Sequence, residues 1–552
     1  MGYQAHEDQR AVIESVAPVL VVSGGAGTGK TTTAVAAARA HLEAADENLL
    51  RLRQEAARRG LRTQLPAATR VLFLSFSRTA VAQIIDRAAN VIGELRARLE
   101  VSTFHGFAWR VITSFGTHHG YPPPQSVLSQ ANRTVPGAPP GLTYDQLMPA
   151  ACRLLALNKI RDHYAGRYTL IICDEFQDTD TTEWAFLQQI APTARRILLG
   201  DVNQSIYEGS FKPGVNPTAR IADAMALPGA RRIDLQAASY RDPSGVLPAA
   251  AEAARRRRFT DPALRSAAQQ GRLAVTRITD ASGYAQVIEI ARAAGQKKHT
   301  VSIFTHTNVA TTSLSDALNA AGLVHEQVGF PEAHAEALSA QLALIQFALG
   351  QEDNQVRRAL AVFITASLRN KQLSPLASQV LQGTNPELER GLGQLAQDLW
   401  SAAHGPNADI DRLAELVTGA YARIGTFRGQ EAWIQAAPIT RRALRLLKEG
   451  QSITALAEEL RRARDETLVG DTRPRPRPVQ VQVMNLHQTK GREADITILL
   501  LASDEYYGPE GEPFPKGSRL LYVVMTRARH QAHLVVPANS HPLWAPLIAA
   551  LE

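Results

Sequence analysis

The chain has 552 residues, which at about 150 residues per domain predicts three to four domains and excludes a single small binding module. Apolar residues make up 45% and charged residues 20%, a composition that excludes a disordered or membrane-embedded chain. The net charge of +8 and the isoelectric point near 9.5 are compatible with a polyanionic partner such as nucleic acid.

Short apolar runs that are typical of buried strands alternate with helical patterns along the chain. The runs lie at residues 19–23, 71–75, 170–174, 197–200, 301–305, 479–484 and 496–501. Continuous apolar strands separated by helices favour parallel sheets that are covered on both faces. We therefore predict an α/β fold with two such sheet units.

Two segments interrupt these units. A Pro/Gly-rich stretch and a following helical segment predict an insertion at about residues 116–165 of the first unit. Residues 331–478 read as a helical insertion that ends in an alternating Arg/Pro linker. The expected domains are thus 1–230, then 231–330 together with 479–552, with the helical insertion between these two parts.

The first motif that carries chemistry is GGAGTGKT at residues 24–31, which matches G-x-x-x-x-G-K-[ST] between a strand and a helix. In such a P-loop, backbone N–H groups surround phosphates, the lysine reaches the terminal phosphates, and the last hydroxyl ligates Mg²⁺. The predicted nucleotide-binding residues are Gly25, Ala26, Gly27, Thr28, Gly29, Lys30, Thr31 and Thr32.

A carboxylate pair completes the nucleotide site. Asp174 and Glu175 follow the apolar run that begins near residue 168, at the strand end where α/β sheets bind ligands. We expect Asp174 to hold Mg²⁺ with Thr31, and Glu175 to orient and deprotonate the attacking water. The two motifs predict nucleoside triphosphate hydrolysis, which a kinase or a GTPase switch would share.

Further segments narrow the choice among classes of nucleoside triphosphate hydrolase. DEFQDT at 174–179 and GDVNQSIY at 200–207 resemble motifs II and III of the UvrD/Rep-like superfamily 1 DNA helicases. Segments around residues 9, 76–80, 102–106, 239–241, 483–493 and 526–528 resemble other motifs of that family in the same order. The resemblance implies two RecA-like P-loop domains with mainly helical insertions, and an ATP hydrolase that acts as a helicase. A P-loop kinase would not account for the second unit.

The resemblance also assigns roles in the ATP site. It implies that Gln9 reads the adenine edge and that Glu493 holds the ribose. Arg241 and Arg527 would reach the γ-phosphate from the second domain as arginine fingers, and Gln204 would sense that phosphate.

Contacts to single-stranded DNA are implied in the same way. Hydroxyl, cationic and aromatic side chains suit phosphate contact and base stacking. The residues concerned are Ser77, Arg78, Thr103, Phe104, His105, Tyr207, Asn308 and His487. The whole segment 487–491 would face DNA. Phe104 is equally consistent with a place in the core, and only Asn308 is retained from the family's Arg-Ser-Asn turn.

The resemblance implies ATP-driven 3′→5′ movement on single-stranded or tailed duplex DNA. The residues after Tyr207 and those around Glu493 depart from the family pattern, with Glu208 after the tyrosine, and Arg492 and Ala494 beside the glutamate. A second reading therefore stays open: a nucleotide-gated DNA-sensing ATPase subunit, with little unwinding activity, of a nuclease-containing repair or antiviral defence complex. The run Arg255–Arg258 is either a DNA contact or a solvated face.

The expected compartment is the cytoplasm. The two cysteines, Cys152 and Cys173, form no disulfide framework or zinc-ligand pattern. No apolar run approaches the ~20 residues needed to span a bilayer, so we expect no membrane partner.

Overall fold

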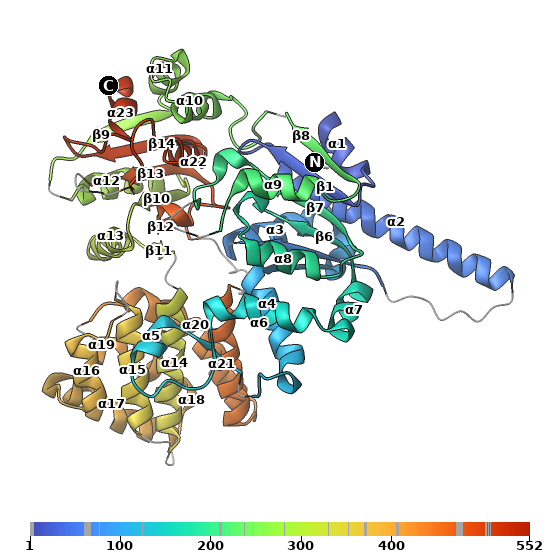
Figure 1. Ribbon diagram of the computed structural model, residues 1–552. Coiled ribbons are helices and arrows are strands. Elements are labelled where there is room, and N and C mark those ends of the chain that lie inside the picture. Colours follow the sequence, from blue (N-terminus) through green and yellow to red (C-terminus); the bar gives the residue numbers. More distant parts are fainter. Residues whose placement is uncertain are drawn as a thin grey trace. The chain divides into compact units, whose positions relative to one another are not determined.

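The computed structural model describes residues 5–552 except 60–67, 77, 124, 209–211, 213, 237, 281, 329–330, 351–352, 369–371, 405–407, 425–426, 471–478, 503–504, 506 and 508. The chain divides into two compact units (Figure 1). Unit 1 comprises Met1–Phe104, Ala151–Val328 and Arg473–Glu552, and unit 2 comprises His105–Ala150 and Gly329–Thr472.

Unit 1 contains two six-stranded sheets, and every pair of neighbouring strands in them is parallel. The first sheet has the order β3-β2-β6-β7-β1-β8. Its strands are β1 (Val19–Gly24), β2 (Arg70–Ser75), β3 (Leu99–Thr103), β6 (Tyr168–Cys173), β7 (Arg195–Gly200) and β8 (Ala230–Leu235). We call this sheet and its helices the first lobe.

Helices cover the first sheet because its strands carry apolar side chains toward both faces. Leu20, Phe73 and Ile172 belong to one buried cluster with residues of α1 (Glu7–Glu14), α2 (Lys30–Arg58) and α3 (Arg78–Val91). The other helices of the lobe are α7 (Asn158–Arg167), α8 (Thr181–Gln189) and α9 (Pro217–Met225). Short 3₁₀ turns, η3 (Phe176–Asp178) and η4 (Val202–Gln204), follow β6 and β7 closely.

The second sheet, with the order β11-β12-β10-β13-β14-β9, forms the second lobe. Its strands are β9 (Leu273–Arg277), β10 (Val301–Thr305), β11 (Glu326–Gln327), β12 (Val481–Asn485), β13 (Ala494–Leu500) and β14 (Ala528–Val536). Adjacent residues of β10 point to opposite faces of the sheet. Phe304 joins a cluster with residues of α10 (Val246–Arg255) and α22 (Ser518–Met525), whereas Ile303 joins one with residues of α12 (Tyr284–Gln296) and α13 (Asn308–Ala320). The helices are α10 (Val246–Arg255), α11 (Pro262–Gln269), α12 (Tyr284–Gln296), α13 (Asn308–Ala320), α22 (Ser518–Met525) and α23 (Ala545–Leu551).

The predicted α/β fold with two parallel sheets is confirmed. Each of the seven apolar runs coincides with a strand, four in the first sheet and three in the second. The strands that the sequence did not reveal are mostly edge strands such as β8, whose exposed side chains break the apolar run. The interior strand β14 was missed because polar residues predominate in its first half, where Arg529, His530 and Gln531 follow one another.

Unit 2 is helical apart from the short pair β4 (Val127–Leu128) and β5 (Leu142–Thr143) among its described residues. The long α14 (Pro331–Ala348) packs on α15 (Asp353–Ala366), α20 (Gln430–Lys448) and α21 (Ile453–Val469). Around them lie α16 (Pro375–Gln382), α17 (Pro386–Ala403), α18 (Ile410–Gly419), α19 (Tyr421–Ile424), α5 (Gln130–Thr134), and parts of α4 (Phe104–Phe115) and α6 (Tyr144–Leu155).

The two insertions therefore pack together. Arg464 of α21 is buried and donates to Glu336 of α14 over 2.7 Å and to Asp465 over 2.7 Å. It also donates to the carbonyl of Val127, and Asn132 donates to Glu336. This buried polar cluster joins residues 127–132 to the helical segment that begins 200 residues later in the chain.

The predicted domain boundaries stay predictions. The structure adds two observations about the segments near them. Residues His105–Ala150 pack in unit 2, whereas α7, inside the predicted insertion, leads directly into β6 and lies in unit 1. The Arg/Pro linker at 471–478 lies outside the described residues.

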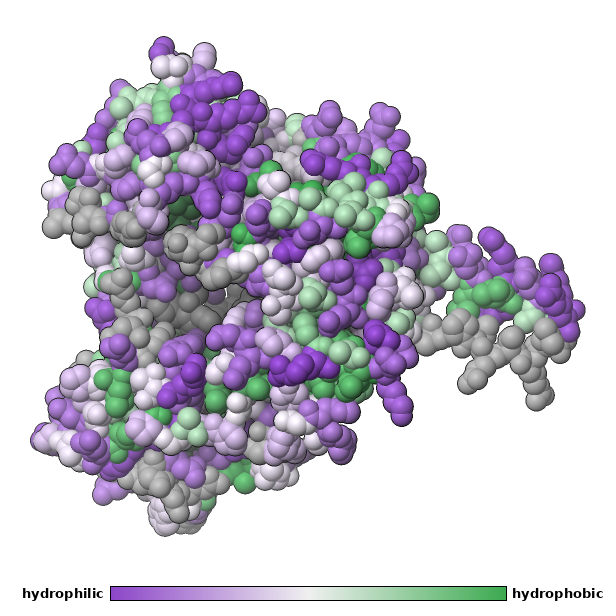
Figure 2. Space-filling view, in the orientation of Figure 1, coloured by the Kyte–Doolittle hydropathy of each residue, from purple (hydrophilic) through white to green (hydrophobic). Residues whose placement is uncertain are grey.

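No helix in the described part of the chain is long and apolar enough to cross a membrane. The face drawn in Figure 2 is largely hydrophilic, with hydrophobic side chains scattered over it. The C-terminal half of α2 projects beyond the first sheet (Figure 1), and Leu50 and Leu52 on it are about half exposed.

Replacing Glu336 by alanine leaves the buried Arg464 guanidinium with Asp465 as its remaining carboxylate partner. We expect unit 2 to lose about 3–5 kcal/mol of stability, because a buried charge loses its partner. Hydrogen exchange of α14, α21 and residues 125–134 in increasing urea measures this loss. Glu415→Ala removes an exposed partner of Arg412 in the same unit and should cost less than about 0.5 kcal/mol. Equal losses in the two variants would contradict the role of the buried cluster.

Candidate functional site

The P-loop runs from the end of β1 to the start of α2. Gly27 has φ +79°, and a Cβ there would lie 2.2 Å from Ser239 Oγ of the approaching segment 239–241, so only glycine fits. The Gly27 carbonyl accepts a hydrogen bond from the Tyr240 amide over 2.8 Å. Lys30 Nζ donates to the loop's own carbonyls, at 2.5 Å from Gly24 O and 3.0 Å from Gly25 O. The lysine side chain thus lies folded back on the P-loop, within which it is expected to bind phosphate.

Asp174 comes immediately after β6 and faces the first turn of α2. Its Oδ2 accepts from Thr31 Oγ1 over 3.2 Å, and its Oδ1 accepts from the Glu175 amide over 3.0 Å. Burial, and then the neighbouring Glu175, raise the pKa of Asp174 to about 6. A hydroxyl and a carboxylate are oxygen ligands of the kind that Mg²⁺ takes. No group of three or more His, Cys, Asp and Glu side chains that would hold a metal occurs among the described residues.

Glu175 has an unusual backbone. Its φ of 53° lies in the left-handed region, which costs a non-glycine residue about 1 kcal/mol or more and tends to occur at functional sites. Burial raises the pKa of Glu175, but Lys490, Lys30 and Arg527 together outweigh burial and hold the pKa below its usual value. The carboxylate is therefore ionised at neutral pH and able to accept a proton.

Two arginines of the second lobe enter the same region. Arg527, 2% exposed, donates to Gln204 Oε1 of the first lobe, while Gln204 Nε2 donates to Asp201 over 2.7 Å. Arg241 donates to Glu493 over 2.8 Å and to the Thr526 carbonyl over 2.6 Å. Burial lowers the pKa of Arg527 to about 10, so this guanidinium group is charged at neutral pH.

Glu493 is surrounded by arginines. Besides Arg241, it accepts from Arg529 over 2.7 Å and lies 3.9 Å from Arg87 of α3. Burial alone would raise the pKa of Glu493, but Arg241 and then Arg529 lower it to about 2. The carboxylate is ionised and is already engaged on both oxygens.

The far end of the site is built around Gln9 on α1, which is fully buried. Its Nε2 donates to the Thr28 carbonyl over 3.2 Å, and its Oε1 accepts from the His6 amide over 3.1 Å and from Tyr240 Oη over 3.4 Å. Tyr240 is 52% exposed, so its ring offers an aromatic face beside the glutamine.

These groups line one cavity of about 1400 Å³ within unit 1. Every residue predicted for nucleotide binding, metal binding or catalysis lines it, with the exception of Gly25. Among the lining residues that sequence reasoning did not assign are three arginines and a tyrosine: Arg10, Arg87, Arg529 and Tyr240. Tyr240 and Arg529 each lie within two residues of a predicted arginine finger, and that proximity was the available signal.

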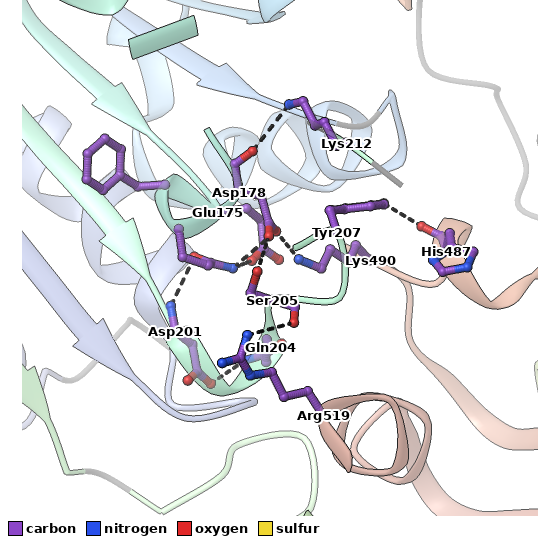
Figure 3. A network of polar contacts seen from close by, with 12 residues as sticks. Glu175, Asp178, Asp201, Gln204, Ser205, Tyr207, Lys212, His487, Lys490 and Arg519 are labelled. Atoms are coloured by element: carbon purple, nitrogen blue, oxygen red, sulfur yellow. Dashed lines mark hydrogen bonds and ion pairs between the residues drawn. The ribbon is translucent and has the colours of Figure 1, made fainter. Parts of the chain in front are cut away.

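A polar network extends from Glu175 away from the cavity (Figure 3). Gln177 Nε2 donates to Glu175 over 2.6 Å, and Ser205 Oγ donates to Asp178 over 2.9 Å. Lys490, which we expected to face DNA with the rest of residues 487–491, instead forms a buried ion pair with Asp178. Burial lowers the pKa of this lysine. Its ammonium group also lies 4.8 Å from the centre of the Tyr207 ring.

Gly491 follows Lys490 and explains the close approach of the lobes there. Its φ is +69°, and a Cβ would lie 2.9 Å from Ala80 Cβ on α3. A side chain at this position would push the loop after β12 away from the first lobe.

The structure brings together only some of the residues that were predicted to contact DNA. Phe104 is 1% exposed and stacks on Phe76 at 4.9 Å, so the expectation that it stacks on a base is wrong for this structure, because its ring is part of the core. Thr103 is also buried, with 4% exposed. Ser77 and the side chain of Arg78 lie outside the described residues.

Tyr207, Asn308 and His487 gather at the loops that follow η4, β10 and β12. Tyr207 Oη donates to the His487 carbonyl, and Asn485 donates to Asn308 over 2.5 Å. Burial lowers the pKa of His487 to about 4, so this imidazole is neutral at pH 7. His105, in unit 2, is half-buried and stacks at 3.8 Å on the exposed ring of Tyr144.

Two further features of the sequence, Glu208 and the arginine run 255–258, have partners within the protein. Glu208, where the family has glycine, accepts from Arg519 over 2.6 Å and lies 3.5 Å from Lys516. In the run 255–258, Arg255 and Arg256 pair with Glu252, and Arg257 packs over the rings of Phe259 and Phe514. These contacts favour the structural interpretation of the run over DNA contact.

Comparison with known proteins finds similarity over part of the chain. Residues 8–210 match a family model described as an AAA domain. DNA helicase II of Escherichia coli is 38% identical over 99 residues, which are 17% of this chain and 13% of the relative. The putative ATP-dependent DNA helicase YjcD of Bacillus subtilis is 33% identical over 106 residues, 19% of this chain and 13% of the relative.

The aligned segment thus spans only about an eighth of the curated relatives. Within that segment the similarity extends beyond isolated motifs to a continuous stretch of sequence. The matches agree with the resemblance that the motifs carry: part of this chain is similar to DNA helicases.

Proposed function

We propose that the protein is an ATP-dependent DNA helicase or translocase that couples ATP hydrolysis to movement along single-stranded DNA. The observation that carries the proposal is the cavity in which a P-loop and a carboxylate pair of one lobe meet two arginines of the other. A hydrolase without motor function would need no second parallel-sheet lobe to supply these arginines.

The P-loop side binds the phosphates. Lys30 exchanges its bonds to the Gly24 and Gly25 carbonyls for bonds to phosphate oxygens, which are stronger because both partners are charged. Thr31 and Asp174 hold Mg²⁺, which neutralises charge that develops on the phosphates. Gln9 and the exposed Tyr240 ring receive the base, by paired hydrogen bonds and by stacking.

Glu175 is the general base. Its ionised carboxylate takes the proton of the attacking water, and Gln177 keeps that carboxylate oriented. The cations Lys490, Lys30 and Arg527 keep it unprotonated at neutral pH.

The arginines connect hydrolysis to the movement of the lobes. Arg241 is held by Glu493 and the Thr526 carbonyl, and Arg527 by Gln204. A terminal phosphate competes with these partners for both guanidinium groups, so ATP draws the second lobe toward the first and phosphate release lets it return.

Single-stranded DNA is the proposed track. The neutral His487 and Tyr207 suit base contact, and Asn308 suits hydrogen bonding to a base or phosphate. The names of the relatives, which are DNA helicases, favour DNA. Movement in the 3′→5′ direction is proposed from the family resemblance.

One observation favours a second function. Glu208 stands in place of the glycine that precedes the family's base-stacking aromatic, and its carboxylate pairs with Arg519 and Lys516. A subunit that senses DNA through nucleotide state, and leaves the effector step to a partner such as a nuclease, would not need a stacking residue there.

ATP turnover with and without single-stranded DNA, together with strand displacement on a 3′-tailed duplex, tests the proposal. We expect turnover that DNA stimulates and displacement that requires ATP. Stimulated turnover without displacement would favour the sensor, and no turnover under any condition would refute both functions.

Lys30→Ala should lower turnover by at least about 100-fold, because one charge that stabilises the transferring phosphoryl group is lost. Phosphate release assays measure this effect. Lys159→Ala, an exposed lysine on α7, is the matched control and should turn over like the unmodified protein. Unchanged turnover of Lys30→Ala would place the nucleotide elsewhere.

Arg527→Ala should retain nucleotide binding but lose about 10³-fold or more in turnover, because an arginine finger acts mainly in the transition state. Binding is measured with a fluorescent nucleotide and turnover by phosphate release. Arg256→Ala, which removes a surface partner of Glu252, is the control. Normal turnover of Arg527→Ala would remove this residue from the catalytic group.

A further inference from the structure

Helix α22 touches the first lobe along one side. Arg519 and Tyr522, three residues apart and therefore on one helical face, both contact it, and Arg527 follows shortly after the helix ends. Arg519 binds Glu208, Arg527 binds Gln204, and Tyr522 reaches the P-loop itself. The first two contacts join side chains, whereas the third engages the backbone that is expected to bind phosphate.

The contact of Tyr522 is specific. The Ala26 amide donates to the Tyr522 phenol oxygen over 3.1 Å, and a Cβ on Gly25 would lie 3.4 Å from the same oxygen. Tyr522 is 7% exposed, and its ring belongs to an apolar cluster with Ala26 and Ile206 of the first lobe. Burial raises the pKa of Tyr522 to about 12, so the phenol remains neutral at physiological pH.

An amide hydrogen is one donor, and it cannot serve two acceptors fully. Ala26 lines the cavity and is one of the P-loop residues whose N–H groups are expected to point at phosphate. In this structure that donor is directed to a side chain of the second lobe. Lys30, the other phosphate ligand, is likewise engaged with protein carbonyls.

We propose that Tyr522 is a positioning residue whose phenol competes with nucleotide phosphate for the Ala26 amide. This inference rests on the proposed nucleotide site. Bound phosphate displaces the phenol from the Ala26 amide, and return of the phenol to Ala26 helps to expel the product. Because the same helix carries Arg519, nucleotide occupancy reaches Glu208 and the segment after Tyr207 through this contact.

The test is Tyr522→Phe, which removes one oxygen and keeps the ring in its apolar cluster. A hydrogen bond of ordinary strength corresponds to roughly threefold to tenfold in affinity. We expect the variant to bind Mg-ADP and a non-hydrolysable ATP analogue that much more tightly, and to release a fluorescent ADP more slowly. Calorimetry measures the affinities, and stopped-flow fluorescence measures the release.

Tyr168→Phe is the matched control. Tyr168 lies at the start of β6, at the opposite end of that strand from Asp174. Its phenol is also buried in unit 1 but donates to Glu100. This variant should bind both nucleotides like the unmodified protein. An equal gain in the control would mean that losing any buried phenol loosens the fold, and would overturn the proposal.

Unchanged affinity of Tyr522→Phe would show that the phenol keeps its bond to Ala26 when nucleotide is bound, and weaker affinity would show that it supports binding. Either result overturns the inference while leaving the proposed function intact. If the unmodified protein binds neither nucleotide, the proposed function and the inference fail together. Thermal unfolding of each variant establishes that it is folded.

Discussion

An excess of positive charge in a partly buried cavity is the constraint on which the site depends. Lys30, Arg87, Arg241, Arg527 and Arg529 line it, against the carboxylates Asp174, Glu175 and Glu493. The protein manages these charges by pairing them internally: lysine with P-loop carbonyls, Arg241 and Arg529 with Glu493, and Arg527 with Gln204. Each pairing is also a place where a polyanionic ligand competes, so the arrangement favours a triphosphate and responds to it by rearranging.

Two of the contacts that cross between the lobes involve short loops at the carboxyl ends of parallel strands: Asp178 with Lys490, and Gln204 with Arg527. Gln177 and Asp178 follow β6, Gln204 and Ser205 follow β7, and Lys490 follows β12. Parallel strands bring their carboxyl ends to one edge of a sheet, so residues distant in sequence meet there. The buried Lys490–Asp178 pair is costly to desolvate, and its value lies in tying the loop after β12 in one lobe to the loop after β6 in the other.

Unit 2 illustrates the same principle with buried polar groups. Arg464, Glu336 and Asn132 come from two separate insertions, yet they satisfy one another in the interior. The sequence predicted that residues 331–470 are helical, because helical periodicity is a local property. It did not predict that residues 127–132 pack with them, because nothing local to either segment indicates its partner.

The sequence by itself determined the α/β class, the seven principal strands and the identity of the phosphate, carboxylate and arginine groups, because apolar runs and compact motifs are local signals. Tertiary structure alone decided which groups share the cavity: it added Tyr240 and Arg529 there, set Tyr522 against the P-loop, turned Lys490 inward, and buried Phe104 in the core. The sequence does not distinguish an aromatic or cationic residue that packs in the core from one that forms an ion pair or binds a ligand. Only the neighbours supplied by distant parts of the chain distinguish these roles.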